Sequence, residues 1–89
     1  MSNMTDYDIV KILKNDVENK NFLNFRKNVK DSKIFEIIMK LYPGNELYDD
    51  YYLNLECLEN NIAFGEDSTN DCNDLIEIVE KLLLLDITP

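Results

Sequence analysis

Apolar residues that recur every three or four positions are the feature that most restricts how this chain can fold. Between positions 45 and 62 they form a single stripe, which consists of Leu47, Tyr48, Tyr51, Leu55, Leu58 and Ile62. This spacing is typical of an amphipathic helix that packs one face against a core. Asn45 precedes the stripe, and its side chain can cap the first turn. We therefore expect a long helix from about Asn45 to Ile62.

Two other segments predict a helix at each end of the chain. Thr5, followed three residues later by Asp8, resembles a capping box and predicts a helix over about residues 5–18. Asp71 can cap a last helix, which follows an acidic loop over residues 63–71. The apolar face of this last helix consists of Leu75, Ile76, Ile78, Val79, Leu82 and Leu83.

The segment between the first helix and the long one, residues 22–42, admits two interpretations. Its apolar residues have helical spacing, but Asp31 with Ser32 offers a second cap in the middle of the segment. The segment therefore predicts either one bent helix or two shorter ones. Pro43 and Gly44 end it, because proline cannot continue a helix and glycine favours a turn.

The length of the chain limits its organisation. Eighty-nine residues are enough for one small core and too few for a two-lobed enzyme. Since short connections favour antiparallel neighbours, the predicted helices should pack as a bundle. We predict a single acidic helical domain over residues 1–89 with an all-α fold, a small antiparallel four-helix bundle. A fifth short helix is expected if the middle segment is divided.

Charge is distributed very unevenly along the chain. The whole sequence has 18 acidic and nine basic residues, a net charge of −9. Residues 1–40 contain eight of the basic residues, whereas residues 41–89 contain only Lys81 together with twelve acidic residues. Such an acidic half argues against direct binding of nucleic acid. It produces a field that can steer a basic protein partner toward it.

Few residues are suited to catalysis or to metal binding. Histidine is absent, which removes the commonest general acid or base and the commonest metal ligand. Fourteen residues separate Cys57 from Cys72, and the two form no C-x-x-C pair, so we expect two reduced thiols. No P-loop or G-x-S-x-G motif occurs. We therefore predict that the protein is not an enzyme and uses no cofactor and no metal.

The sequence also bears on where the protein is expected. Its first residues lack the basic patch and apolar run of a signal peptide. The longest apolar run, Leu82–Leu85, is far too short to cross a bilayer. We expect a cytoplasmic protein that has no membrane partner.

The face of the long helix that lies opposite its apolar stripe is the best candidate for a binding site. Projected at 100° per residue, Leu53 lies on this face among four acidic residues, Glu46, Asp49, Asp50 and Glu56. An apolar side chain ringed by charges resembles the centre and rim of a protein interface. A single exposed leucine is also ordinary, and another helix could cover it. Tyr52 lies at the edge of the stripe and could reach outward.

The order of these segments resembles the colicin D-type immunity proteins. The resemblance rests on the capped first helix, the middle helical pair, the long helix that ends in Glu56-Cys57-Leu58-Glu59, the acidic turn and the last apolar helix. It implies an acidic four-helix bundle that binds and inactivates a tRNA-cleaving toxin domain. It also implies that Glu56 and Glu59 take the place of tRNA phosphates in the toxin. Asn61 departs from the pattern, since a further acid is expected there.

The residues and the resemblance predict the same kind of partner, a basic nuclease toxin domain bound 1:1. The predicted partner-binding residues are Glu46, Asp49, Asp50, Tyr52, Leu53, Glu56, Glu59, Glu66 and Asp67. A first alternative is a phage-encoded nucleic-acid mimic, such as an anti-CRISPR or anti-restriction protein. A second is a small helical adaptor that recognises a partner peptide, for which Leu53 and Tyr52 would matter more than the acids.

Overall fold

Five helices make up most of residues 6–41 and 44–87, the part of the chain that the computed structural model describes. They are α1 (Asp6–Glu18), α2 (Phe22–Val29), α3 (Ser32–Met39), α4 (Glu46–Ala63) and α5 (Thr69–Ile87). No strand occurs within these residues, which confirms the all-α prediction. The middle segment is divided into α2 and α3, so the fifth, short helix is present.

The ends of the helices follow from local capping. The Asp31 carboxylate accepts a hydrogen bond from the Lys33 N–H (2.9 Å), and the Asn45 side chain accepts one from the Leu47 N–H (2.9 Å), as the sequence predicted. Thr5, the predicted cap of the first helix, lies outside the described residues.

The start of the last helix differs from the prediction. Helix α5 begins at Thr69, two residues before the expected cap, because the Asp67 carboxylate accepts a hydrogen bond from the Thr69 N–H (2.8 Å). Asp71 therefore lies inside the first turn, where its carboxylate accepts a hydrogen bond from the Asn61 amide of α4.

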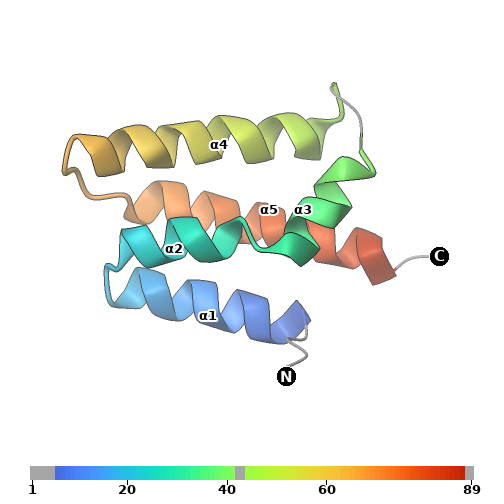
Figure 1. Ribbon diagram of the computed structural model, residues 1–89, viewed down its shortest axis with the longest axis horizontal. Helices are drawn as coiled ribbons and strands as arrows, with labels where there is room; N and C mark the ends of the chain where they lie inside the picture. Colours follow the sequence, from blue (N-terminus) through green and yellow to red (C-terminus); the bar gives the residue numbers. More distant parts are fainter. Residues whose placement is uncertain (1–5, 42–43, 88–89) are drawn as a thin grey trace.

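Helix α5 is the centre of the structure, because it contacts each of the other four described helices. In Figure 1, α1 and α2 run in opposite directions, as do α4 and α5, while α3 turns away from the axis of α2 toward the start of α4. Seven residues of α5 are buried, and they are Cys72, Leu75, Ile76, Ile78, Val79, Leu82 and Leu83. These seven are the largest contribution of any helix to the 17 buried hydrophobic residues of the described core, and the other helices pack against them.

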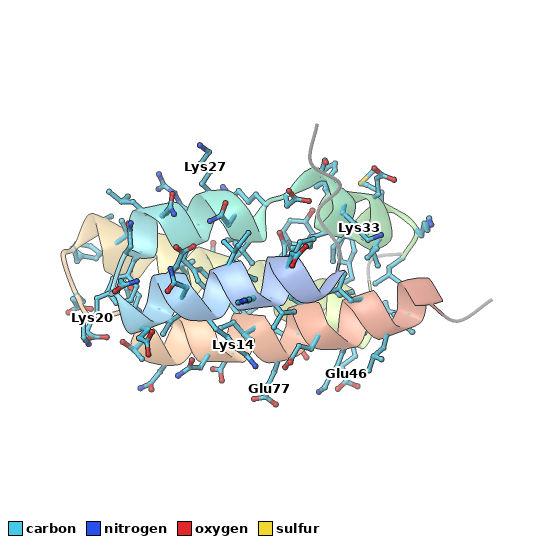
Figure 2. All side chains as sticks on the ribbon, turned by 90° about the horizontal axis from the view of Figure 1, so that it is seen from below. Lys14, Lys20, Lys27, Lys33, Glu46 and Glu77 are labelled. Carbon is cyan, nitrogen blue, oxygen red and sulfur yellow. The ribbon has the colours of Figure 1, made fainter. Side chains whose placement is uncertain are left out.

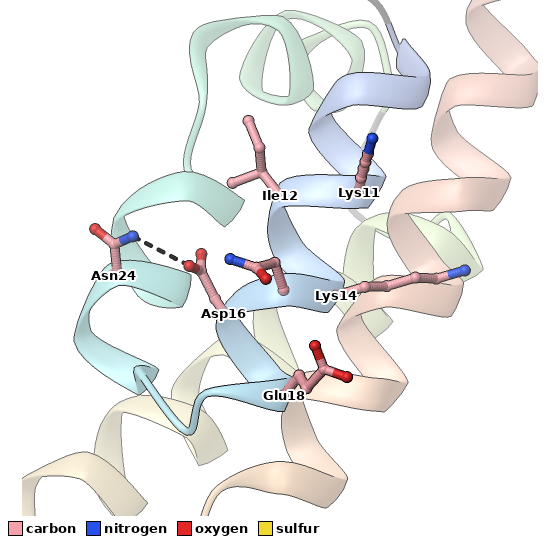
Figure 3. Close-up of a pocket in the computed structure, with 7 residues that line it drawn as sticks. Lys11, Ile12, Lys14, Asp16, Glu18 and Asn24 are labelled. Atoms are coloured by element: carbon pink, nitrogen blue, oxygen red, sulfur yellow. Dashed lines mark hydrogen bonds between the residues drawn. The ribbon is translucent and has the colours of Figure 1, made fainter.

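Two buried polar groups connect the remaining helices. The Tyr51 hydroxyl of α4 donates a hydrogen bond to the carbonyl oxygen of Val29 at the end of α2 (2.9 Å), and burial raises the pKa of this hydroxyl. Asp16 of α1 is 5% exposed, and its carboxylate accepts hydrogen bonds from the side-chain amides of Asn24 (3.1 Å) and Asn28 (2.8 Å) on α2. Figure 3 shows the Asn24 contact at the shallow hollow between α1 and α2.

Replacing Asp16 by alanine is expected to destabilise the fold by about 1–3 kcal/mol, because the two α2 amides lose a buried acceptor. Urea unfolding measures this difference. Glu18→Ala removes an exposed carboxylate from the same helix and should change the stability by no more than about 0.5 kcal/mol. Equal stability of the two variants would show that the Asp16 hydrogen bonds do not hold α1 to α2.

Candidate functional site

The outer face of α4 is exposed because the inner face packs into the core. Tyr51, Leu55 and Leu58 are buried, and the helical repeat turns the residues between them outward. Leu53 is 59% exposed, so no other described helix covers it. We call Glu46, Asp49, Asp50, Leu53 and Glu56 the acidic face of α4; all but the half-buried Asp50 are exposed.

The two acids of the predicted phosphate-mimic motif have different surroundings. Glu59 forms an ion pair with Lys30, which follows α2, with Nζ and Oε2 2.8 Å apart. Glu56 is exposed, and no ion pair or hydrogen bond of its side chain is found within the described residues. Glu59 therefore already has a cationic partner, Lys30, within the fold. Glu56 has none among the described residues, so its carboxylate can pair with a cation of another protein.

The two acids of the loop between α4 and α5 also differ. Asp67 forms an ion pair with Lys20 (2.7 Å), from the turn between α1 and α2, in addition to accepting the Thr69 N–H. These hydrogen bonds, that from Lys20 above all, hold the pKa of the Asp67 carboxyl well below its usual range. Glu66 is exposed. Asp67 therefore joins the loop between α4 and α5 to the turn between α1 and α2, a contact that the sequence did not predict.

Tyr52 lies at the edge of the acidic face, toward α2 and α3. Its side chain is 37% exposed, and its ring centroid is 5.0 Å from that of Tyr48 and 5.1 Å from that of Tyr51. Offset and edge-on ring contacts of this kind fix the orientation of aromatic side chains. Tyr52 is therefore a rigid, partly apolar surface beside the carboxylates, with one side open to solvent.

Basic residues of the first half contact acidic residues of the second half at three places. Lys20 and Lys30 do so as described above, and Lys14 of α1 lies 3.8 Å from Glu80 of α5. Figure 2 shows Lys14 extending from α1 toward α5, at the edge of the molecule where Glu77 is also drawn. Each pair is exposed and contributes little stability alone. None of the three ion pairs includes a carboxylate of the acidic face of α4.

Sequence reasoning missed the exposed apolar residues of α3. Phe35 is 49% exposed and Met39 is 64% exposed, although both belong to a strongly apolar helix. A signal was present, since Phe35 falls outside the stripe formed by Ile34, Ile37 and Ile38, all of which are buried. The sequence also did not predict the ion pairs of Lys20 with Asp67 and of Lys30 with Glu59, because the paired residues are 47 and 29 positions apart, respectively.

Other kinds of site receive no support from the described residues. No group of three Cys, Asp or Glu side chains in residues 6–41 and 44–87 is placed to hold a metal ion. Nor does any helix there combine the length and the hydrophobicity needed to cross a membrane.

Comparisons of the chain with protein-family models, with curated proteins and with solved structures gave no match. The resemblance to colicin D-type immunity proteins therefore stays a prediction that depends on the residues quoted for it. The assignment of partner-binding residues stays a prediction as well, although the geometry of each is now defined.

The two cysteines should react at very different rates. Both are free thiols, but Cys57 is exposed on α4 whereas Cys72 is buried. Burial is the main reason that the pKa of the Cys72 thiol is raised to about 12, and the negative charge of Asp71 is the next cause. Because the thiolate is the nucleophile, a disulfide reagent at pH 8 should modify one thiol quickly in the folded protein and the second only after unfolding in guanidinium. Cys57→Ser should remove the fast reaction. Two equally fast thiols would contradict the burial of Cys72.

Proposed function

We propose that this protein binds and inactivates the nuclease domain of a bacterial toxin in a 1:1 complex. The acidic face of α4 occupies the basic groove that holds RNA phosphates, and Glu66 lies at the rim of the contact. The scaffold in this proposal is the small antiparallel four-helix bundle that the sequence predicts, with α3 as an additional short helix. As for the immunity proteins that the chain resembles, the effect is protection of the cell from the toxin.

One observation carries the proposal, the absence of any basic residue from α4. Its 18 residues include five acids and no lysine or arginine. A helix stabilised for its own sake usually alternates acidic and basic residues four positions apart. The self-repulsion of α4 disfavours the isolated fold, and a cationic partner relieves it.

The carboxylates of the acidic face are spread over more than half the length of α4. Glu46 and Glu56 are ten residues apart, which is roughly 15 Å along a helix axis. Leu53 lies between them and can be desolvated at the centre of the contact, while the carboxylates around it pair with lysine and arginine of the nuclease. Charge complementarity of this kind raises the association rate and selects against acidic partners.

The main alternative uses the same residues for a different target. A phage-encoded nucleic-acid mimic would cover the binding channel of a defence effector with the acidic face of α4. The neighbouring gene distinguishes the two functions, because an immunity gene is expected directly after the gene of its toxin.

The first test is purification of the tagged protein from its native host at low and at high salt. We expect a basic nuclease domain to co-purify in stoichiometric amount at low salt and to be lost at high salt. Co-expression of the two in a sensitive cell should then protect that cell. Recovery of a nucleic-acid-guided effector would favour the alternative, and recovery of no basic partner would contradict both functions. Binding that persists at high salt would favour a peptide-binding adaptor.

Charge reversal on α4 tests the residues themselves. The double variant Glu56→Lys/Glu59→Lys should weaken binding of the captured nuclease by about 2–5 kcal/mol and slow its association. The control Asp74→Lys/Glu77→Lys makes the same change in net charge on exposed residues of α5 and should have a much smaller effect.

The two double variants separate a local contact from a general effect of charge. Equal weakening by both would show that only the net charge matters, and unchanged protection by Glu56→Lys/Glu59→Lys would remove these residues from the interface. Because Glu59→Lys also breaks the ion pair with Lys30, urea unfolding of each variant checks that the fold is retained.

A further inference from the structure

A groove of about 680 Å³ lies between α3 and α4, next to the acidic face. It exists because α3 packs against α5, while α4 packs against α5 and α2. Ser32 and Phe35 of α3 form one wall, and Tyr52 and Leu55 of α4 form the other. The ion pair between Lys30 and Glu59 also lines the groove.

The walls of this groove expose more apolar surface than a solvated helix surface requires. Phe35 and Tyr52 are 49% and 37% exposed, and Met39, which lies on the same stripe of α3 as Ser32 and Phe35, is 64% exposed. Clustered apolar side chains that remain in contact with water mark a binding surface more often than isolated ones do.

The groove is continuous with the predicted partner-binding residues, since Tyr52 and Glu59 belong to both. Asp49 and Glu56 lie three positions before and four positions after Tyr52, hence on the same side of α4. Any group that enters the groove from solvent therefore passes beside carboxylates. An occupant with an apolar tip matches the walls of the groove, and positive charges on either side of that tip match the neighbouring carboxylates.

We infer that the groove receives an aliphatic side chain of the partner, presented in a segment that carries arginine or lysine on both sides. This inference rests on the proposed function and extends it, because it adds a desolvated anchor to the electrostatic contact. Glu59 supports the arrangement: Lys30 contacts its Oε2 atom, and within the described residues no partner is found for Oε1. A cation of the partner can therefore bind Glu59 while the internal ion pair is kept.

Two acetylated and amidated peptides test the inference on the intact protein. One has the sequence Arg-Lys-Leu-Arg-Lys, and the other has glycine in place of leucine and so the same charge. In a titration followed by amide NMR, the leucine peptide should bind about fivefold more tightly, which corresponds to about 1 kcal/mol for the anchor. Signals of Ser32, Phe35 and Leu55 should move with the leucine peptide and not with the glycine peptide.

Variants of two exposed aromatic residues provide the matched comparison. Phe35→Ser should abolish the preference for leucine, whereas Phe64→Ser, which changes an 80% exposed residue at the far end of α4, should retain it. Both positions are exposed, so neither substitution threatens the fold.

The outcomes separate the groove from the proposed function. Equal affinity for the two peptides, or a preference that survives in Phe35→Ser, would overturn the anchor site while leaving the acidic face in place. Absence of binding by either peptide at millimolar concentration would also overturn it. The proposed function is judged separately, by capture of the nuclease domain and by protection of the cell.

Discussion

The burial of α5 is the interaction on which the rest of the structure depends. Seven of its residues are buried, and each of the other four described helices contacts it. A helix that is apolar over so wide an arc cannot be stable at a surface, so it requires neighbours on several sides. The amphipathic helices α1 to α4 supply these neighbours, and each keeps its polar side toward solvent. The outer face of α4 is exposed for this reason.

The uneven distribution of charge has two structural consequences in this arrangement. Lysines of the first half approach acids of the second half at three places, which favours the packing of α1 and α2 on the acidic helices. Among the acids of the described residues that remain without such partners are Glu46, Asp49, Asp50 and Glu56 of α4, and Asp74 and Glu77 of α5. Some carboxylates, such as Asp16 and Asp67, therefore have partners within the fold, whereas others, such as Glu56, have none among the described residues and are the ones that the proposed function assigns to a basic partner.

The sequence predicted the all-helical fold because the apolar residues have helical spacing, and it located the caps of α3 and α4 at Asp31 and Asn45. The division of the middle segment at Asp31 was one of two interpretations that the sequence left open, and the exposure of Leu53 depended on whether another helix covers it. The predicted start of α5, directly after Asp71, was three residues too late, because the Asp67 carboxylate accepts the Thr69 N–H and is itself paired with Lys20 from a distant turn. The ion pair of Glu59 and the groove beside Phe35 were beyond prediction, since they require knowledge of which helices pack together. Local periodicity carries no information of that kind.

The central position of α5 has a consequence for the synthesis of the protein. It is the last of the described helices to leave the ribosome, and the other four have no common core before it does. Without α5 we expect these helices to be only weakly formed, because short helices are marginal in water without packing. The acidic face of α4 is therefore presented on a rigid surface only after the last helix has been made. A chain truncated before α5 should have the same carboxylates but no defined shape to place them against a partner.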